Sequence, residues 1–291
     1  MNITRSLKAR VGGAVTLLSA ISALSNSITA EALSFLPTRL ILDDNHRAVQ
    51  LQLINDSDRA QRYVIEWQSM QMDRSGNVAF VEQSQMTTPP SSDHIISGPR
   101  QAIVPPGGRQ VVRFLSKIPP DAPDGEYRSH ILITEPPALG SEISPEANGD
   151  ITINIDTVIR TTLPVILRKG NLQADLDPLE WWLETSKKTE PELGLLLQRS
   201  GNRSVNVLAT IEWLPFEGKP EILVEEQFAF YTDIEQKIIR HQLPDLETEQ
   251  LSAGRIRYNL EQLDREGAPV KTVFEETLST SELAPEPPTD L

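Results

Sequence analysis

Apolar and polar residues alternate most regularly between Asp150 and Gly170. Side chains of a β-strand point alternately to the two faces of a sheet, so this alternation predicts one long strand with an apolar row on one face. The strand is over twice the usual length of roughly 5–6 residues. The sequence does not indicate which segment packs against its apolar row. The row consists of Ile151, Ile153, Ile155, Thr157, Ile159, Thr161 and Leu163.

Shorter alternating segments precede this strand, and turn residues separate them. "SFLPTRLILDD" reads as one strand, and "RAVQLQLINDSD" alternates until it reaches its Asn/Asp/Ser cluster. About seven such segments occur at a spacing of roughly 8–12 residues, which is typical of a β-sandwich.

The pattern restarts after "RKGNLQAD" with shorter strands and no sustained helical periodicity. We therefore predict an all-β protein with a first β-sandwich over residues 33–168 and a second, smaller one over residues 169–277. The polar, proline-rich end, residues 278–291, is predicted to be disordered.

The N-terminal segment has the three-part layout of a secretory signal peptide. Arg5, Lys8 and Arg10 precede the apolar run "VGGAVTLLSAISAL", and Ala30-Glu31-Ala32 supplies a cleavage pattern. The run is shorter than the ~20 residues that span a bilayer. We expect residues 1–32 to be removed and the remainder to be exported without membrane insertion.

Composition argues against several classes of function. The net charge of −14 is unsuited to nucleic acid as a partner. The absence of cysteine excludes Cys-zinc sites and thiol nucleophiles. The four histidines have no metal-ligand spacing, and no catalytic or phosphate-binding motif is present. The sequence thus predicts neither an enzyme nor a metal site or cofactor.

Two arginines stand out by their position. Arg39 lies in an apolar context within the first predicted strand, and Arg168 ends the long strand. A buried guanidinium is costly unless it is paired, so each either has a carboxylate partner or faces water at a strand end.

Several segments together resemble the PapD-like periplasmic chaperones of the chaperone–usher pilus pathway, in particular their divergent, alternative branch. They are "LPTRLILDDNHRAVQLQLINDSDRAQRYVIEW", "GPRQAIVPPGGRQVVRF" and "PDGEYRSHILI", within residues 35–170. The resemblance implies two immunoglobulin-like sandwiches arranged as an L. It also implies a function: the long strand would complete the fold of a pilus subunit that lacks one strand, until an outer-membrane usher takes the subunit. Under this hypothesis Ile151, Ile153, Ile155 and Ile159 are the side chains that enter the subunit.

The resemblance also implies an anchor for the subunit's terminal carboxylate, made of two basic residues. Arg39 matches the first. Pro164 stands at the place of the second and cannot serve, so Arg160, four residues earlier on the same face, is the substitute.

A buried ionic contact between the two sandwiches is implied as well. Glu126 and Arg168 match two of its members, and Asp264 is the candidate for the acid from the second sandwich.

Two rival classes stay open. The first is a structural pilus subunit or surface adhesin, which needs an incomplete sandwich and a free donor extension; the second is an exported immunoglobulin-like hydrolase. The sequence also leaves open whether the free protein caps its own strand by forming a homo-oligomer.

Overall fold

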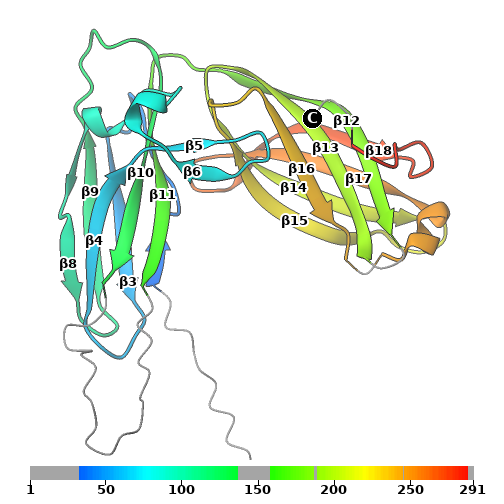
Figure 1. Cartoon of the computed structure of the whole chain (residues 1–291), viewed down its shortest axis with the longest axis horizontal. Helices are drawn as coiled ribbons and strands as arrows, with labels where there is room; N and C mark the ends of the chain where they lie inside the picture. The colour runs from blue at the N-terminus through cyan, green and yellow to red at the C-terminus, as the bar shows by residue number, and fades with distance from the viewer. Residues whose placement is uncertain (1–32, 137–157, 187–188, 245, 288–291) are drawn as a thin grey trace, which may run out of the picture. The chain divides into compact units, whose positions relative to one another are not determined.

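The computed structural model describes residues 33–136, 158–186, 189–244 and 246–287, and these residues form two β-sandwiches (Figure 1). Each sandwich has two sheets with the strand order of immunoglobulin-like domains. The predicted all-β fold with two immunoglobulin-like domains is confirmed. The predicted signal peptide lies outside the described residues. Within those residues, none of the helices is long and apolar enough to cross a membrane.

As far as it is described, the first sandwich contains eleven strands and two short 3₁₀ helices. They are β1 (Leu33–Leu36), β2 (Leu40–Leu42), β3 (Ala48–Asn55), β4 (Gln61–Gln68), β5 (Met70–Met72), β6 (Val78–Phe80), η1 (Gln83–Gln85), η2 (Ser92–His94), β7 (Ile95–Gly98), β8 (Gln101–Val104), β9 (Arg109–Ser116), β10 (Gly125–Glu135) and β11 (Ile159–Lys169). One sheet has the order β1–β3–β9–β7 and the other the order β2–β11–β10–β4–β8, while β5 and β6 form a separate hairpin.

Alternation along these strands forms the core of the first sandwich. On β9, Val112 and Phe114 are buried, whereas Arg113 and Leu115 are exposed. Together with Leu51 of the neighbouring strand β3, these buried residues form one apolar core with residues of the facing sheet such as Ile131 and Val165. The alternation of apolar and polar residues in the sequence is therefore the direct cause of the two-layer packing.

The segment predicted as one strand, "SFLPTRLILDD", is in fact two strands in different sheets. β1 pairs with β3, and β2 pairs in parallel with β11. Pro37 lies between them, and proline has no N–H group to continue a sheet ladder. Arg39 consequently lies in the bend between two strands rather than within one, which corrects its predicted position.

The second sandwich begins after the turn at Gly170. Its elements are β12 (Ala174–Ser186), β13 (Thr189–Gly201), β14 (Val205–Pro215), β15 (Glu221–Phe230), β16 (Gln236–Gln242), η3 (Thr248–Ala253), β17 (Gly254–Leu263) and β18 (Pro269–Leu278). A sheet with the order β12–β13–β16 faces a sheet with the order β15–β14–β17–β18.

The chain after β18 does not match the predicted disorder as far as it is described. The amide N–H of Leu183 donates to the carbonyl of Ala284 at 2.8 Å, and Trp182 forms a parallel bridge with the same residue. Leu283 packs against the core of the second sandwich. The prediction was wrong for residues 279–287 because it was based on the polar composition. It did not take into account that Leu283 could pack against an apolar surface.

Candidate functional site

The most unusual edge of the first sandwich belongs to β11. Along its whole length β11 pairs with β10 on one side. On the other side, the parallel partner β2 covers only Val165–Leu167. Among the described residues, no strand pairs with Ile159–Pro164 on that side, so the backbone groups that point away from β10 form an uncovered sheet edge, to which Pro164 contributes no N–H (Figure 1).

The predicted apolar row passes from the interior of the sandwich to this edge. Leu163, Val165 and Leu167 are buried members of the core. Ile159, on the same parity, is 42% exposed. The sequence placed Leu163 in the uncovered row, but the sandwich covers it itself, because the row continues into its own core. The predicted strand segment 150–157 and its side chains Ile151, Ile153 and Ile155 lie outside the described residues.

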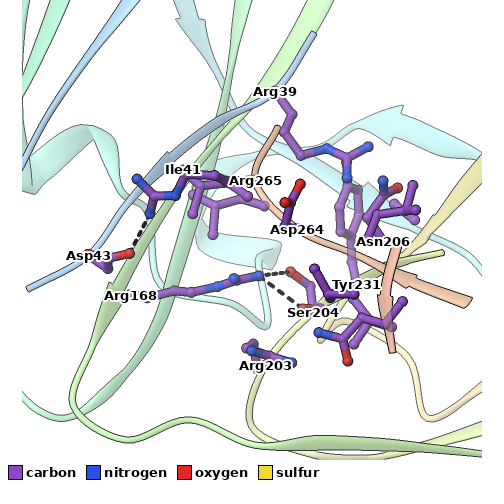
Figure 2. A pocket seen from close by; sticks show the side chains of 16 residues that line it. Arg39, Ile41, Asp43, Arg168, Arg203, Ser204, Asn206, Tyr231, Asp264 and Arg265 are labelled. Atoms are coloured by element: carbon purple, nitrogen blue, oxygen red, sulfur yellow. Dashed lines mark hydrogen bonds and ion pairs between the residues drawn. The ribbon is translucent and has the colours of Figure 1, made fainter. Parts of the chain in front are cut away.

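A pocket of about 280 Å³ opens beside β11 and is lined by four arginines from both sandwiches (Figure 2). Arg39 comes from the bend before β2, and Arg168 from β11. Arg203 lies in the turn between β13 and β14, and Arg265 in the turn between β17 and β18. Four guanidinium groups around one small cavity favour an anionic ligand, above all one with the planar fork of a carboxylate.

The four arginines differ in how far they are already engaged. Arg265 pairs with Asp43. Arg168 donates to Glu126 at 3.1 Å and to the carbonyl of Ser204 at 3.0 Å. For Arg39, by contrast, the described part of the chain provides neither an ion pair nor a hydrogen bond. Burial lowers the pKa of Arg39, Tyr231 raises it and Arg168 lowers it further. The side chain of Arg203 likewise forms no ion pair or hydrogen bond among the described residues, and its Nε is buried without a partner. Arg39 and Arg203 are thus the two guanidinium groups left for a ligand.

The structure does not bring Arg160 to this pocket. Arg160 is exposed near the start of β11, in register with Thr134. Leu40 is in register with Val165, so Arg39 continues beside Pro164. Four residues separate Pro164 from Arg160, a distance of about 13 Å along a strand. Arg168, four residues beyond Pro164 in the other direction, lines the pocket instead.

The predicted contact between the sandwiches exists in part, with a different partner. Glu126 and Arg168 form an ion pair, and the backbone N–H and hydroxyl of Ser204 both donate to Glu126, at 3.0 and 2.8 Å. Asp264 lines the pocket, but its carboxylate accepts from the backbone of its own turn, at Glu266 and Ala268. No described ion pair joins Asp264 to Glu126 or Arg168. Ser204 holds the place that was assigned to Asp264.

Sequence reasoning missed an ion pair that joins the two sandwiches directly. Arg128 of β10 pairs with Asp233, and both side chains are almost fully buried. The guanidinium carbon of Arg128 lies 4.2 Å from the ring centre of Tyr231. The hydroxyl of Thr88 donates to Asp233 at 3.0 Å. Nearby, burial lowers the pKa of His130 to about 3, which keeps its imidazole neutral.

A signal for this pair was present in the sequence. Glu126, Arg128 and His130 occupy one parity of β10, and apolar residues such as Ile131 and Ile133 occupy the other. Three ionisable side chains on one face of a strand need partners from outside their sheet. The pattern therefore indicated a polar face of β10, although it did not reveal Asp233.

The described residues contain no group of histidine and acidic side chains arranged to hold a metal ion. The ring of His46, for example, is exposed, and its Nδ1 lies 3.0 Å from a carboxylate oxygen of Asp43. The site consists of an open strand edge and an arginine pocket.

Comparison with known proteins adds structural likeness only. No family model matches the chain, and no curated protein matches it. The YadV chaperone is similar at 13% identity and a TM-score of 0.46, with 84% of this chain and 99% of that chain covered. The Pseudomonas aeruginosa CupB2 chaperone is similar at 14% identity and a TM-score of 0.40, with 84% and 99% covered. A chain in the complex of the Salmonella enterica SafA pilin with the SafB chaperone follows at 14% and 0.42, with 85% and 97% covered.

Proposed function

We propose that the chain is a periplasmic chaperone for pilus subunits. It adds β11 as an extra strand to a subunit whose immunoglobulin-like fold lacks one, and it passes that subunit to an outer-membrane usher. The observation that carries the proposal is the uncovered edge of β11 over Ile159–Pro164. Strand addition uses such an edge for main-chain hydrogen bonds and alternate side chains for specificity. It makes and breaks no covalent bond, so it requires no catalytic residue and no cofactor.

The edge offers enough interaction to hold a partner. Each main-chain hydrogen bond contributes a net of roughly 0.5–1.5 kcal/mol. Full burial of an isoleucine such as Ile159 contributes roughly 1.5–3 kcal/mol. Ile151, Ile153 and Ile155, on the same parity, would extend this gain if the strand continues toward the N-terminus in the complex.

The arginine pocket supports the proposal with a place for a terminal carboxylate. Arg39 and Arg203 are the guanidinium groups of this pocket without a described partner, and Arg39 directly precedes Leu40, which is in register with Val165 of β11. A carboxylate bound there would set the register of the added strand, because it fixes one end of the partner against one residue of the chaperone. Arg168 is better placed than Arg160 to supply the second positive charge.

The rival class, a pilus subunit or adhesin, needs a sandwich with a missing strand. In the described residues each sandwich has two facing sheets around a buried core. This arrangement favours a donor of a strand over an acceptor.

A site-specific crosslink tests the proposal. The chain has no cysteine, so Ile159→Cys carries a photocrosslinker at the open edge of β11 and nowhere else. Ile103→Cys is the matched control, because Ile103 is 73% exposed on β8 at the opposite edge of the same sheet. With a co-expressed pilus subunit that lacks its donor extension, we expect crosslinks from position 159 and few from position 103. Equal yields from both positions would refute strand addition at β11.

The anchor is tested separately by Arg39→Ala, with Arg113→Ala on the exposed face of β9 as its control. We expect recovery of the co-expressed subunit to fall with the first variant and to be unchanged with the second. Undiminished recovery with Arg39→Ala would refute the anchor role while leaving strand addition in place.

A further inference from the structure

A second and larger pocket, of about 890 Å³, lies where the two sandwiches meet. Its size is within the roughly 300–1,000 Å³ typical of small-ligand sites. Residues 87–127 of the first sandwich and residues 199–235 of the second contribute to its walls. Glu126 lines this pocket, and its partner Arg168 lines the arginine pocket, so one ion pair separates two cavities.

The charge of this pocket is opposite to that of the arginine pocket. Five carboxylates line it: Asp121, Asp124, Glu126, Asp233 and Glu235. The one guanidinium in its wall belongs to Arg199 and donates to backbone carbonyls, including Gly201 at 2.9 Å and Ile234 at 3.3 Å. The dipoles of these backbone carbonyls therefore stabilise the positive charge of Arg199. Burial lowers the pKa of the Arg199 guanidinium.

Some of the carboxylates are already neutralised within the protein. Asp233 pairs with Arg128, and Glu126 pairs with Arg168. Asp124 is exposed and has only Lys169, at 3.8 Å. Asp121 and Glu235 are exposed, and neither takes part in an ion pair among the described residues. Two to three negative charges at the mouth of the pocket are thus available to a ligand.

Two further features indicate the chemistry of that ligand. The side chain of Glu126 is almost fully buried in the pocket wall, and its Oε1 has no hydrogen-bond partner among the described residues. A positive charge in the pocket would offset this oxygen through space. The rings of His94 and Tyr127 also line the pocket, packed edge to face at 5.1 Å between centroids. Aromatic rings beside carboxylates favour organic cations.

We propose that this pocket binds an organic cation, either a protonated amine or a guanidinium, through Asp121, Glu235 and the aromatic wall of Tyr127. A metal ion fits less well, because no described cluster of acidic and histidine side chains has the arrangement of a metal site. The same chemistry is present in a free polyamine and in a lysine or arginine side chain of a partner protein.

Binding of a cation in this pocket is independent of strand addition, because neither β11 nor Arg39 lines the pocket. It does couple a ligand to the boundary between the sandwiches. A cation held by Asp121 from one sandwich and Glu235 from the other connects the two, so binding stabilises their contact.

Calorimetric titration of the full mature chain tests the proposal with three probes: spermidine, a peptide Gly-Gly-Lys-Gly-Gly blocked at both ends, and Mg²⁺. The pocket variant is Asp121→Asn with Glu235→Gln, two exposed side chains outside the ion pairs. The control is Asp175→Asn with Glu275→Gln, which removes the same charge from exposed positions on β12 and β18. We expect the pocket variant to weaken binding of an organic cation about tenfold, and the control to change it by less than about twofold.

The outcomes separate the sources. Tighter binding of spermidine indicates a free polyamine, and tighter binding of the lysine peptide indicates a side chain of a partner. Equal losses in the two variants, tighter binding of Mg²⁺ than of both organic probes, or no binding at all would each overturn the proposal. An unchanged melting temperature of the pocket variant without ligand shows that the loss comes from the pocket and not from unfolding.

Discussion

The two sandwiches share one architecture but treat their sheet edges in opposite ways. In the second sandwich, the segment after β18 returns to edge strand β12, where Leu183 donates to Ala284. In the first, β2 leaves Ile159–Pro164 of β11 without a partner on one side. An exposed edge is a risk for aggregation that proteins normally cover. Other edge strands, such as β15 and β16, are also unpaired on one side among the described residues. It is under the proposed function that the open edge of β11 serves a partner.

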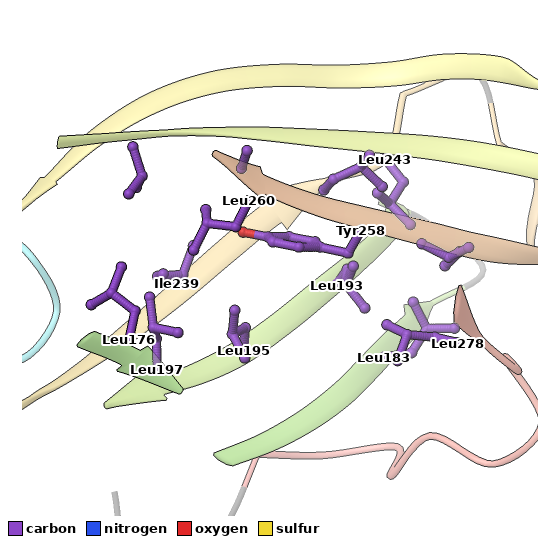
Figure 3. Packing of buried hydrophobic residues seen from close by; sticks show 14 of the residues in the cluster. Leu176, Leu183, Leu193, Leu195, Leu197, Ile239, Leu243, Tyr258, Leu260 and Leu278 are labelled. Carbon is purple, nitrogen blue, oxygen red and sulfur yellow. The ribbon is translucent and has the colours of Figure 1, made fainter. Parts of the chain in front are cut away.

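The two cores differ in the same sense. In the second sandwich, Leu193, Leu195 and Leu197 of β13 face Tyr258 and Leu260 of β17 inside a closed interior (Figure 3). In the first, the row on β11 begins inside the core at Leu167 and Leu163 and ends at the exposed Ile159. In the second sandwich, the apolar alternation therefore packs the interior. In the first sandwich, a similar alternation packs the interior and also leaves Ile159 exposed at the end of the row.

The largest expected effect comes from breaking the closed side. Trp182 of β12 is fully buried, and a Cβ atom on Gly194 would lie only 1.9 Å from its ring. Trp182→Ala leaves a large cavity, so we expect it to lower the free energy of unfolding by about 3–5 kcal/mol. Urea denaturation followed by fluorescence measures the change. A loss below about 1 kcal/mol would show that the closed edge is not needed for stability.

The second prediction concerns the stability contributed by Lys237, a buried residue where the two sandwiches are in contact. Lys237 of β16 is buried beside Gly76 of the β5–β6 hairpin, and burial lowers its pKa from 10.5 to about 8. The unfolded chain thus binds more protons between these values, so the free energy of unfolding rises from pH 8 to about 10.5. Lys237→Met should remove this rise and increase stability at pH 7 by about 1–3 kcal/mol.

Denaturation of both proteins across this pH range checks the second prediction. The gain is limited because Lys237 also donates to the carbonyl of Ala229 at 2.9 Å. Parallel curves for the wild type and the variant would contradict the assigned pKa.

A third change opens the covered edge. Removing residues 279–291 deletes the hydrogen bond to Leu183 and the packing of Leu283, and we expect a loss of about 1–2 kcal/mol. Leu283→Ser should reproduce part of that loss with the chain length unchanged. Sedimentation at increasing concentration should also detect self-association of the truncated chain, because β12 would then present a free edge.

The smallest effect is expected at the open edge itself. Ile159→Ala removes a side chain that is already exposed, so the free energy of unfolding should change by less than about 0.5 kcal/mol. The same variant should reduce recovery of a co-expressed pilus subunit. A large loss of stability without a partner would mean that Ile159 packs within its own sandwich.

Much of the fold could be predicted because it depends on local alternation. The two sandwiches, their boundary near Lys169 and the parity of β11 all follow from periodicity and turn residues. Arg39 was misplaced because the alternation on both sides of Pro37 looks continuous, although the chain changes sheets there.

The contacts between the sandwiches could not be predicted in the same way. Ser204 and Asp233 approach β10 from strands and turns far along the chain, and nothing in their local sequence distinguishes them from other surface residues. Asp264 was chosen for its charge, yet its own turn already uses that carboxylate. Local patterns identify which face of β10 needs partners, and only the tertiary packing identifies the partners.

The apolar row on β11 has a thermodynamic consequence of its own. Any molecule that settles on Ile159 extends a column of side chains whose other end is Leu167, deep in the first sandwich. A ligand bound at Ile159 would then stabilise the folded first sandwich. Its melting temperature would rise with the concentration of the bound partner. Calorimetry could thus follow the loading of this protein without a label, through a transition that belongs to its own fold.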